Sequence, residues 1–255
     1  AQVKPVTFIK VLDALELETP VPLKGKIRGE VAVRGELENP LIELDLVTAG
    51  SSRIDKLDFK QIDADLELVG STLSVKQFTS LPRSGGKFEG NGKLQLNGLQ
   101  NLAFNIWATN VSGTAIARSY DNKLPVDLGL ISGQTKLSAQ AGDLSTLRLR
   151  AGEARFPLGN GMVQVDKLNY ANGIWSSKLR TLGVEFGSLP FGKGSAPTIA
   201  KGLVNGVFDV SGTKDLSNLN QVKARGKANL STVGGKIPIP KIKITDGHWQ
   251  ADAKI

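Results

Sequence analysis

The stretch of residues 25–37 constrains the fold of this chain more than any other. It reads Gly-Lys-Ile-Arg-Gly-Glu-Val-Ala-Val-Arg-Gly-Glu-Leu, with Gly, Ile, Val or Leu at every odd position and a charge at five of the six even positions. Successive side chains of a β-strand point to opposite faces, so this period of two places a small apolar face opposite a solvated one. Pro40 cannot donate to a ladder, and Asn-Pro favours a turn. The stretch therefore predicts an amphipathic strand that ends before residue 40.

The pattern recurs along the chain. Residues 201–212 align with residues 24–35 without a gap, and looser copies lie at 86–96 and 129–139. The copies begin at residues 25, 86, 129 and 202. This uneven spacing argues against a solenoid of strict period and favours a loose array with hairpins between the copies. Chance matching within a Gly-rich β protein is the alternative.

Most of the remaining chain also alternates with the strand period. Further strands are predicted at residues 42–46, 61–68, 73–75, 102–108, 147–151, 163–165 and 222–230. Asn172-Gly173 predicts a hairpin turn, because both residues tolerate positive φ. Residues 11–18 permit a short helix, but the prolines around them favour a strand, which we predict. Residues 187–200 are the least regular stretch and predict a loop or an interruption.

Composition sets outer bounds on the class of protein. The 255 residues are 40% hydrophobic but only 5% aromatic, which predicts an aliphatic interior of Leu, Ile and Val. There is no Cys, so disulfides and thiolate sites are excluded. No apolar run approaches the roughly 20 residues that span a bilayer. The chain begins abruptly in strand-like sequence, and we expect it to be a segment of a longer protein.

The net charge of +8 is unevenly distributed. Residues 1–75 carry 9 Lys and Arg against 13 Asp and Glu, a net charge of −4, whereas residues 76–255 carry 23 against 11, a net charge of +12. The basic residues occur singly at alternating positions and lack the aromatic partners of a nucleic-acid site. A solvated strand face is predicted, and a weak attraction to anionic lipid headgroups also fits.

Short strands with hairpin spacing suggest a sandwich, a barrel or a long folded sheet. Inward glycines leave space and let a sheet curve. The sequence therefore predicts an all-β fold, with one elongated curved sheet over residues 1–255 whose apolar faces meet across a groove. The predicted groove-lining residues are Ile27, Val31, Val33, Leu44, Leu46, Leu66, Leu68, Phe88, Leu94, Leu96, Phe104, Ile106, Phe208 and Val210.

The stretch at 25–40 with its terminal Asn-Pro, its partner at 202–212 and the strands between them resemble the TamB family. This family is related to the AsmA-like and bridge-like lipid transfer proteins and has a chloroplast envelope counterpart. The copy at 202–212 departs from the pattern, since Lys214-Asp-Leu-Ser replaces Leu-Glu-Asn-Pro. The resemblance implies a β-taco or half-pipe with an aliphatic interior. It also implies a periplasmic middle segment, anchored in the inner membrane and reaching an outer-membrane β-barrel protein through its missing C-terminal part, or a plastid counterpart.

Residues that carry catalysis are sparse. His248 is the only histidine, so a two-His metal site and a His relay are excluded. Asp63, Asp65 and Glu67 share one strand face but lack the loop of a cation site, and a solvated face is predicted. Residues 187–193 resemble the start of a phosphate-binding loop, but Gly194 replaces the required Ser or Thr. We predict no enzymatic activity, no cofactor and no metal.

The predicted function is passive conduction of phospholipid along the groove between two membranes, with the acyl chains as partners and without nucleic acid. A periplasmic scaffold for the assembly of outer-membrane β-barrel proteins is the alternative. A surface adhesin with a solid β core is a further one. What fills the groove distinguishes them: lipid, peptide or the chain's own side chains.

Overall fold

The computed structural model describes residues 2–14, 21–36, 40–98, 100–122, 127–140, 143–188, 202–213, 219–246 and 248–252. Strands account for 74% of the structure, which contains two short helices, and they form an open antiparallel sheet. The predicted all-β fold class is therefore confirmed.

The chain divides into two compact units, which are described separately. Unit 1 comprises Ala1–Val111 and Thr135–Arg148, and unit 2 comprises Ser112–Gln134 and Leu149–Ile255. The interruption that the sequence predicted near 187–200 lies outside the described residues from residue 189 onwards. A single continuous segment over 1–255 stays a prediction.

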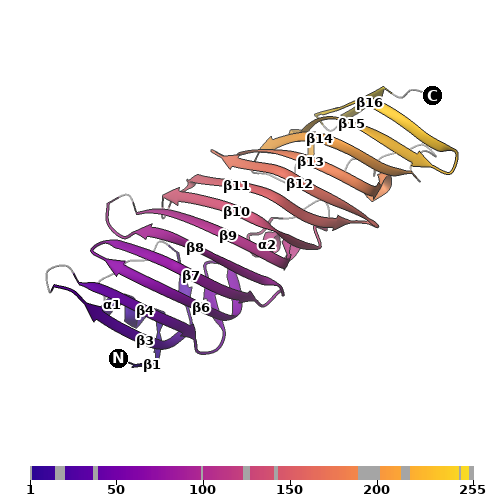
Figure 1. Cartoon of the computed structure of the whole chain (residues 1–255). Helices are drawn as coiled ribbons and strands as arrows, with labels where there is room; N and C mark the ends of the chain where they lie inside the picture. Colours follow the sequence, from indigo (N-terminus) through magenta and orange to yellow (C-terminus); the bar gives the residue numbers. More distant parts are fainter. Residues whose placement is uncertain are drawn as a thin grey trace. The chain divides into compact units, whose positions relative to one another are not determined.

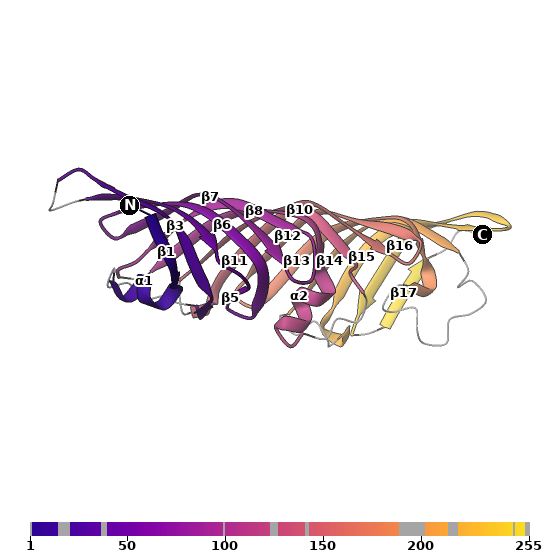
Figure 2. The same cartoon turned by 90° about the horizontal axis from the view of Figure 1, so that it is seen from below.

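Unit 1 consists mainly of strands that follow one another in sequence and in space (Figure 1). They are β1 (Gln2–Thr7), β2 (Leu23–Lys24), β3 (Lys26–Arg34), β4 (Leu41–Thr48), β5 (Ser52–Ile54), β6 (Leu57–Val69), β7 (Thr72–Pro82), β8 (Lys87–Gln95) and β9 (Asn101–Ser112). The pairs run in the order β1-β3-β4-β6-β7-β8-β9, all antiparallel. The register of β7 shifts against both neighbours around Lys76 and Gln77, and such bulges bend a strand. Figure 2 shows the bent ribbons of this unit.

Unit 2 continues the same hairpin pattern in its own strands. They are β12 (Gly161–Ala171), β13 (Ile174–Glu185), β14 (Leu203–Thr213), β15 (Lys223–Thr232), β16 (Gly235–Thr245) and β17 (His248–Asp252). Each pairs antiparallel with the next. Two further strands, β10 (Leu130–Gln140) and β11 (Asp143–Leu158), contribute residues to both units. Single 3-10 turns occur at η1 (Phe186–Ser188) and η3 (Leu219–Gln221).

Several strands and one turn that the sequence predicted are present in the structure. All four copies of the Gly motif form strands, namely β3, β8, β10 and β14. Asn172 and Gly173 both have positive φ, 52° and 73°, and connect β12 to β13, so the predicted hairpin turn is confirmed. Local turn chemistry thus sets the boundaries of the strands that present the candidate site.

The helices were not predicted. The preference for a strand over residues 11–18 is wrong for the part that the structure describes, because α1 (Phe8–Ala14) covers residues 11–14. The second helix, α2 (Gly113–Ser119), starts where the side chain of Ser112 accepts a hydrogen bond from the Ala115 amide at 3.2 Å. That contact satisfies one of the free N–H groups at a helix start.

Candidate functional site

The predicted groove residues of unit 1 lie on one face of its sheet. Directly opposed residues of an antiparallel pair point to the same face, so the register defines rows across the strands. One row reads Val31, Leu44, Leu66, Val75, Gly92 and Phe104. The next rows read Val33, Ile42, Leu68, Leu73, Leu94 and Leu102, and Gly29, Leu46, Ala64, Phe78, Gly90 and Ile106. We call this surface the apolar face of unit 1.

Three predicted residues fall outside these rows. Ile27 alternates with Gly29 on β3 and is buried, so it lies on the same face opposite Thr48. Phe88 alternates with Gly90 and is paired with Ser80 and Ala108. Leu96 follows the end of β8, where its amide donates to the Ser71 carbonyl at 2.8 Å. The alternation in the sequence thus assigned these residues of β3 to β9 to one face of the sheet, and their role as the lining of a groove stays a prediction.

Burial across the apolar face is uneven. Ile27, Leu44 and Leu68 are buried. Val33, close to the end of β3, is 64% exposed. The other predicted residues of unit 1 are partly exposed. An apolar surface that is neither sealed nor fully solvated is consistent with contact to a further apolar molecule.

Aromatic rings lie over glycines on this face. A Cβ added at Gly92 would come within 2.3 Å of a ring carbon of Phe104, and one added at Gly90 within 2.7 Å of the Phe78 ring. The two rings meet edge to face with centroids 6.5 Å apart. The sequence suggested that inward glycines leave space. In the structure the rings of Phe78 and Phe104 occupy the space beside Gly90 and Gly92.

Unit 2 has its own apolar face, which contains the two remaining predicted residues. Phe208 is buried in a cluster with Val163, Val184, Val204 and Leu230. Val210 packs against that cluster and lies opposite Ser177 and Ala224. Sequence reasoning missed the other cluster members, although the strand predicted at residues 163–165 gave a signal for one of them, Val163.

In the described parts of the chain, the densest packing joins strands that are neighbours in the sheet, and α1 lies against β1 and β2. Figure 2 shows α1 beside β1 at the edge of unit 1. The candidate site is therefore the apolar face of unit 1, a surface made of side-chain rows in which most predicted residues are partly exposed and three are buried.

The polar face of unit 1 is acidic along β4 and β6. Glu43 opposes Glu67, and Asp45 opposes Asp65. A shallow hollow of about 390 Å³ lies over these strands and includes Glu30 and Lys76. Local cations neutralise part of this charge, because Arg34 pairs with Glu43 at 3.3 Å and Lys76 with Glu67 at 2.9 Å.

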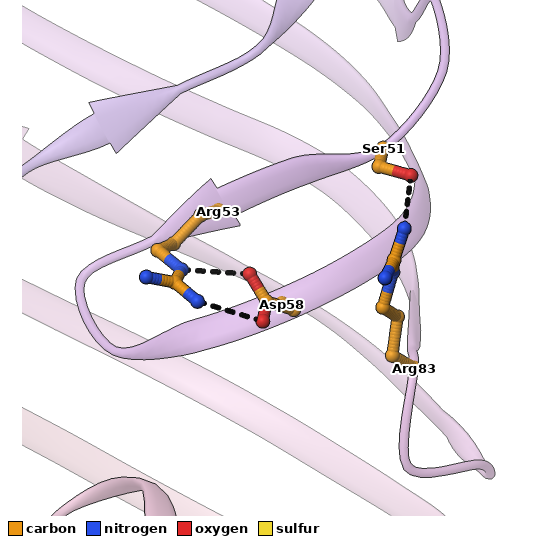
Figure 3. Close-up of polar contacts among 4 residues, drawn as sticks. All are labelled: Ser51, Arg53, Asp58 and Arg83. Carbon is orange, nitrogen blue, oxygen red and sulfur yellow. Dashed lines mark hydrogen bonds and ion pairs between the residues drawn. The ribbon is translucent and has the colours of Figure 1, made fainter.

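The hairpin of β5 and β6 is held by a bidentate ion pair at the surface (Figure 3). Arg53 donates to the two carboxylate oxygens of Asp58 at 2.7 and 2.8 Å. Arg83 donates to the Ser51 hydroxyl at 2.7 Å. The hydrogen bonds from Arg53 lower the pKa of Asp58, and the same bonds raise the pKa of Arg53. This pair fixes local geometry and lies away from the predicted lipid-contacting residues.

Residues with catalytic or metal-binding chemistry are not gathered in the described part of the chain. His248 is exposed on β17. Asp63 accepts a hydrogen bond from Gln61 at 2.9 Å, and Asp65 accepts one from Gln77. Within the described ranges no three His, Asp or Glu side chains are placed to hold a metal ion.

Within the described residues, neither helix has the length and apolarity that crossing a bilayer requires. Comparison with family models, with curated proteins and with solved structures finds no match for this chain.

Proposed function

We propose that this chain binds the acyl chains of phospholipids on its apolar faces and conducts them passively between two membranes. The observation that carries the proposal is the uninterrupted set of apolar rows in unit 1, most of whose predicted residues remain partly exposed. A soluble protein ordinarily covers such a surface, and a large exposed apolar patch marks an interaction site.

The energetic need for such a surface is large. Leaving an acyl chain in water costs about 0.8 kcal/mol per CH₂ group, so a chain of sixteen carbons costs roughly 12 kcal/mol. An aliphatic surface removes most of that penalty without a reacting group. The phosphate headgroup stays hydrated at the open side. The proposed process therefore needs no catalytic residue, cofactor or metal.

The cellular setting is proposed on the same basis. An envelope protein of the TamB type would place this segment in the periplasm, with an anchor in the inner membrane and an outer-membrane β-barrel protein as partner. The all-β open sheet and the four Gly-motif strands support this proposal.

Lipid extraction from the purified protein, followed by mass spectrometry, tests the proposal, with two matched variants beside the wild type. Leu94→Glu places a charge on the apolar face between Leu73 and Leu102. The site is open, so the charge stays hydrated and the protein folds, but acyl chains are repelled. Lys93→Glu is the control, because Lys93 is the adjacent residue on the opposite, exposed face.

We expect copurified phospholipid in the wild type and in Lys93→Glu, and at least about a tenfold loss in Leu94→Glu at an unchanged melting temperature. Copurified peptide instead of lipid would support the scaffold for outer-membrane proteins. An unfolded Leu94→Glu would indicate a closed core, because stranding a charge there costs several kcal/mol. Folded Leu94→Glu with undiminished lipid would refute the acyl-binding surface.

A further inference from the structure

The polar face of unit 2 concentrates positive charge that is not neutralised within the described parts of the chain. One row of directly opposed residues reads Lys167, Lys178, Asp209, Arg225 and Lys243. Lys223 and Lys227 lie on the same face of β15 as Arg225. We call Lys167, Lys178, Lys223, Arg225, Lys227 and Lys243 the basic face.

Ion pairs form in both units. In unit 1, Arg34, Arg53, Lys76 and Lys87 each pair with a carboxylate, and on β13 of unit 2 Arg180 pairs with Asp166 at 3.0 Å. Among the described residues, none of the six cations of the basic face forms an ion pair, and Asp209 is the only acidic residue in their row. Like charges in adjacent positions of a sheet destabilise it, so an external anion that binds here also relieves repulsion.

The surface between these cations is suited to phosphate groups. A shallow hollow of about 710 Å³ opens over β12 to β16 and brings Lys178, Arg225 and Lys243 together with the hydroxyl and amide groups of Ser176, Ser211 and Asn169. Lysine, arginine, hydroxyl and amide groups are the side chains that donate to phosphate oxygens. Strands spaced about 4.8 Å apart present them as a two-dimensional array.

Large apolar side chains lie on the same face and identify the kind of anion. Ile174 and Leu182 alternate with Lys178 and Arg180 along β13 and are 61% and 48% exposed. Leu203 shares the face with Asp209 on β14 and is also exposed. Basic residues with exposed apolar residues on one surface are the combination that binds the headgroup region of a bilayer. Stacking aromatics, which a single-stranded nucleic acid requires, are absent from the described residues of this row.

We infer that the basic face of unit 2 docks on the surface of a bilayer rich in anionic phospholipid. The cations bind headgroup phosphates, and Ile174, Leu182 and Leu203 enter the interfacial region. The basic face lies on the opposite side of the sheet of unit 2 from the apolar face that is proposed to bind acyl chains. The two proposals can therefore be refuted independently of each other.

Vesicle cosedimentation of the whole chain tests the inference. Wild-type protein is mixed with vesicles of pure phosphatidylcholine or with vesicles in which about one lipid in three is phosphatidylglycerol. We expect binding to the anionic vesicles only, and weakening as salt shortens the Debye length to about 8 Å at physiological ionic strength. Equal binding to both kinds of vesicle would overturn the inference.

Matched charge variants separate the basic face from net charge. Lys178→Gln with Arg225→Gln removes two cations from the face, and Arg28→Gln with Lys93→Gln removes two exposed cations from unit 1. We expect the first pair to weaken vesicle binding roughly 10- to 30-fold and the second pair less than about twofold. Equal losses in both pairs would overturn the inference. The salt dependence of the wild type stands as a separate measurement if a variant fails to fold.

A second pair of variants distinguishes a bilayer from other polyanions. Ile174→Ser with Leu182→Ser removes apolar contact from the basic face, and Val69→Ser is the control on the polar face of unit 1, where Val69 is 41% exposed. We expect the double variant to bind anionic vesicles at least about fivefold more weakly, with binding to duplex DNA unchanged. If the double variant bound vesicles as well as the wild type, or if the wild type bound DNA more tightly than vesicles, the ligand would be a soluble polyanion and not a bilayer. Either result would overturn the assignment.

Discussion

On the apolar faces, aromatic rings pack against glycines of the neighbouring strand. Phe104 lies over Gly92 and Phe78 over Gly90, while Phe208 lies over Gly226. A chain with few aromatic residues thus covers the apolar side of its backbone with a small number of rings. Each ring packs directly on the glycine backbone, which is possible because glycine has no Cβ.

Two Gly→Ala substitutions test this role and should have opposite effects. In Gly92→Ala the new Cβ falls 2.3 Å from Phe104 and 2.6 Å from the Ala103 carbonyl oxygen, so ring and backbone must both shift. We expect the free energy of unfolding to drop by about 1–3 kcal/mol. Gly152→Ala is the control, since its nearest neighbour is the Asp166 carbonyl oxygen at 3.7 Å. It should be neutral or stabilise by up to about 1 kcal/mol, because it restricts the unfolded chain. Urea denaturation measures both, and equal effects would contradict the pairing of ring and glycine.

At this scale the sequence predicts which face a side chain occupies but not what it touches. Period-two alternation placed Leu44, Leu66 and Leu94 on one face, and the register agrees. Alternation carries no information on how far a strand extends past its neighbour, so the exposure of Val33 was missed. The direction of the Phe104 ring depends on which residue of the neighbouring strand lies opposite it. That pairing joins residues that are distant in the sequence, so the local sequence does not determine it.

Among the elements, strands were predictable and the two helices were not. Asn172-Gly173 fixes a hairpin by its own backbone preferences, so its sequence was sufficient. The seven residues of α1 and of α2 are shorter than two full periods of a helical pattern in each case, and propensity over such lengths is weak. A short helix is decided by its contacts with neighbouring strands, which the local sequence does not contain.

The β5–β6 hairpin should depend on pH through Asp58. The pKa of Asp58 is lowered in the folded protein from its ordinary value of 3.8, so the ionised form favours folding. This contribution is present above that value and is lost as the pH falls through the lower folded pKa. We expect Asp58→Asn to reduce the melting temperature slightly at neutral pH, and the difference from wild type to vanish in acid. The pair lies at the surface, where solvent screens it, so the effect is small. A difference that persists unchanged at the acid end would contradict the role of the ion pair.

For the whole molecule, the charge asymmetry of the sequence has a structural counterpart within each unit. The acidic residues follow the polar face of β4 and β6, and the unpaired cations follow the polar face of β13 to β16. The sequence predicted a solvated face for both. It did not predict that the six cations of the basic face form no ion pair among the described residues, because that depends on which strands become neighbours.

Ligand binding should be visible in the stability of the whole chain. A ligand that binds the native state alone stabilises it by about 2.7 kcal/mol at a concentration one hundred times its dissociation constant. We expect a long-chain fatty acid below its micellar concentration to raise the melting temperature of delipidated protein. Butyrate is the control, because its short chain buries few CH₂ groups. An identical response to both acids would contradict acyl-chain binding.

The seating of Phe104 on Gly92 makes the two positions epistatic. While the ring is present, enlarging position 92 collides with it, and while position 92 is glycine, removing the ring bares backbone to water. A lineage that replaces the pair must therefore shrink position 104 before it enlarges position 92. In an alignment of relatives the two columns would covary, with glycine at one position accompanied by an aromatic residue at the other.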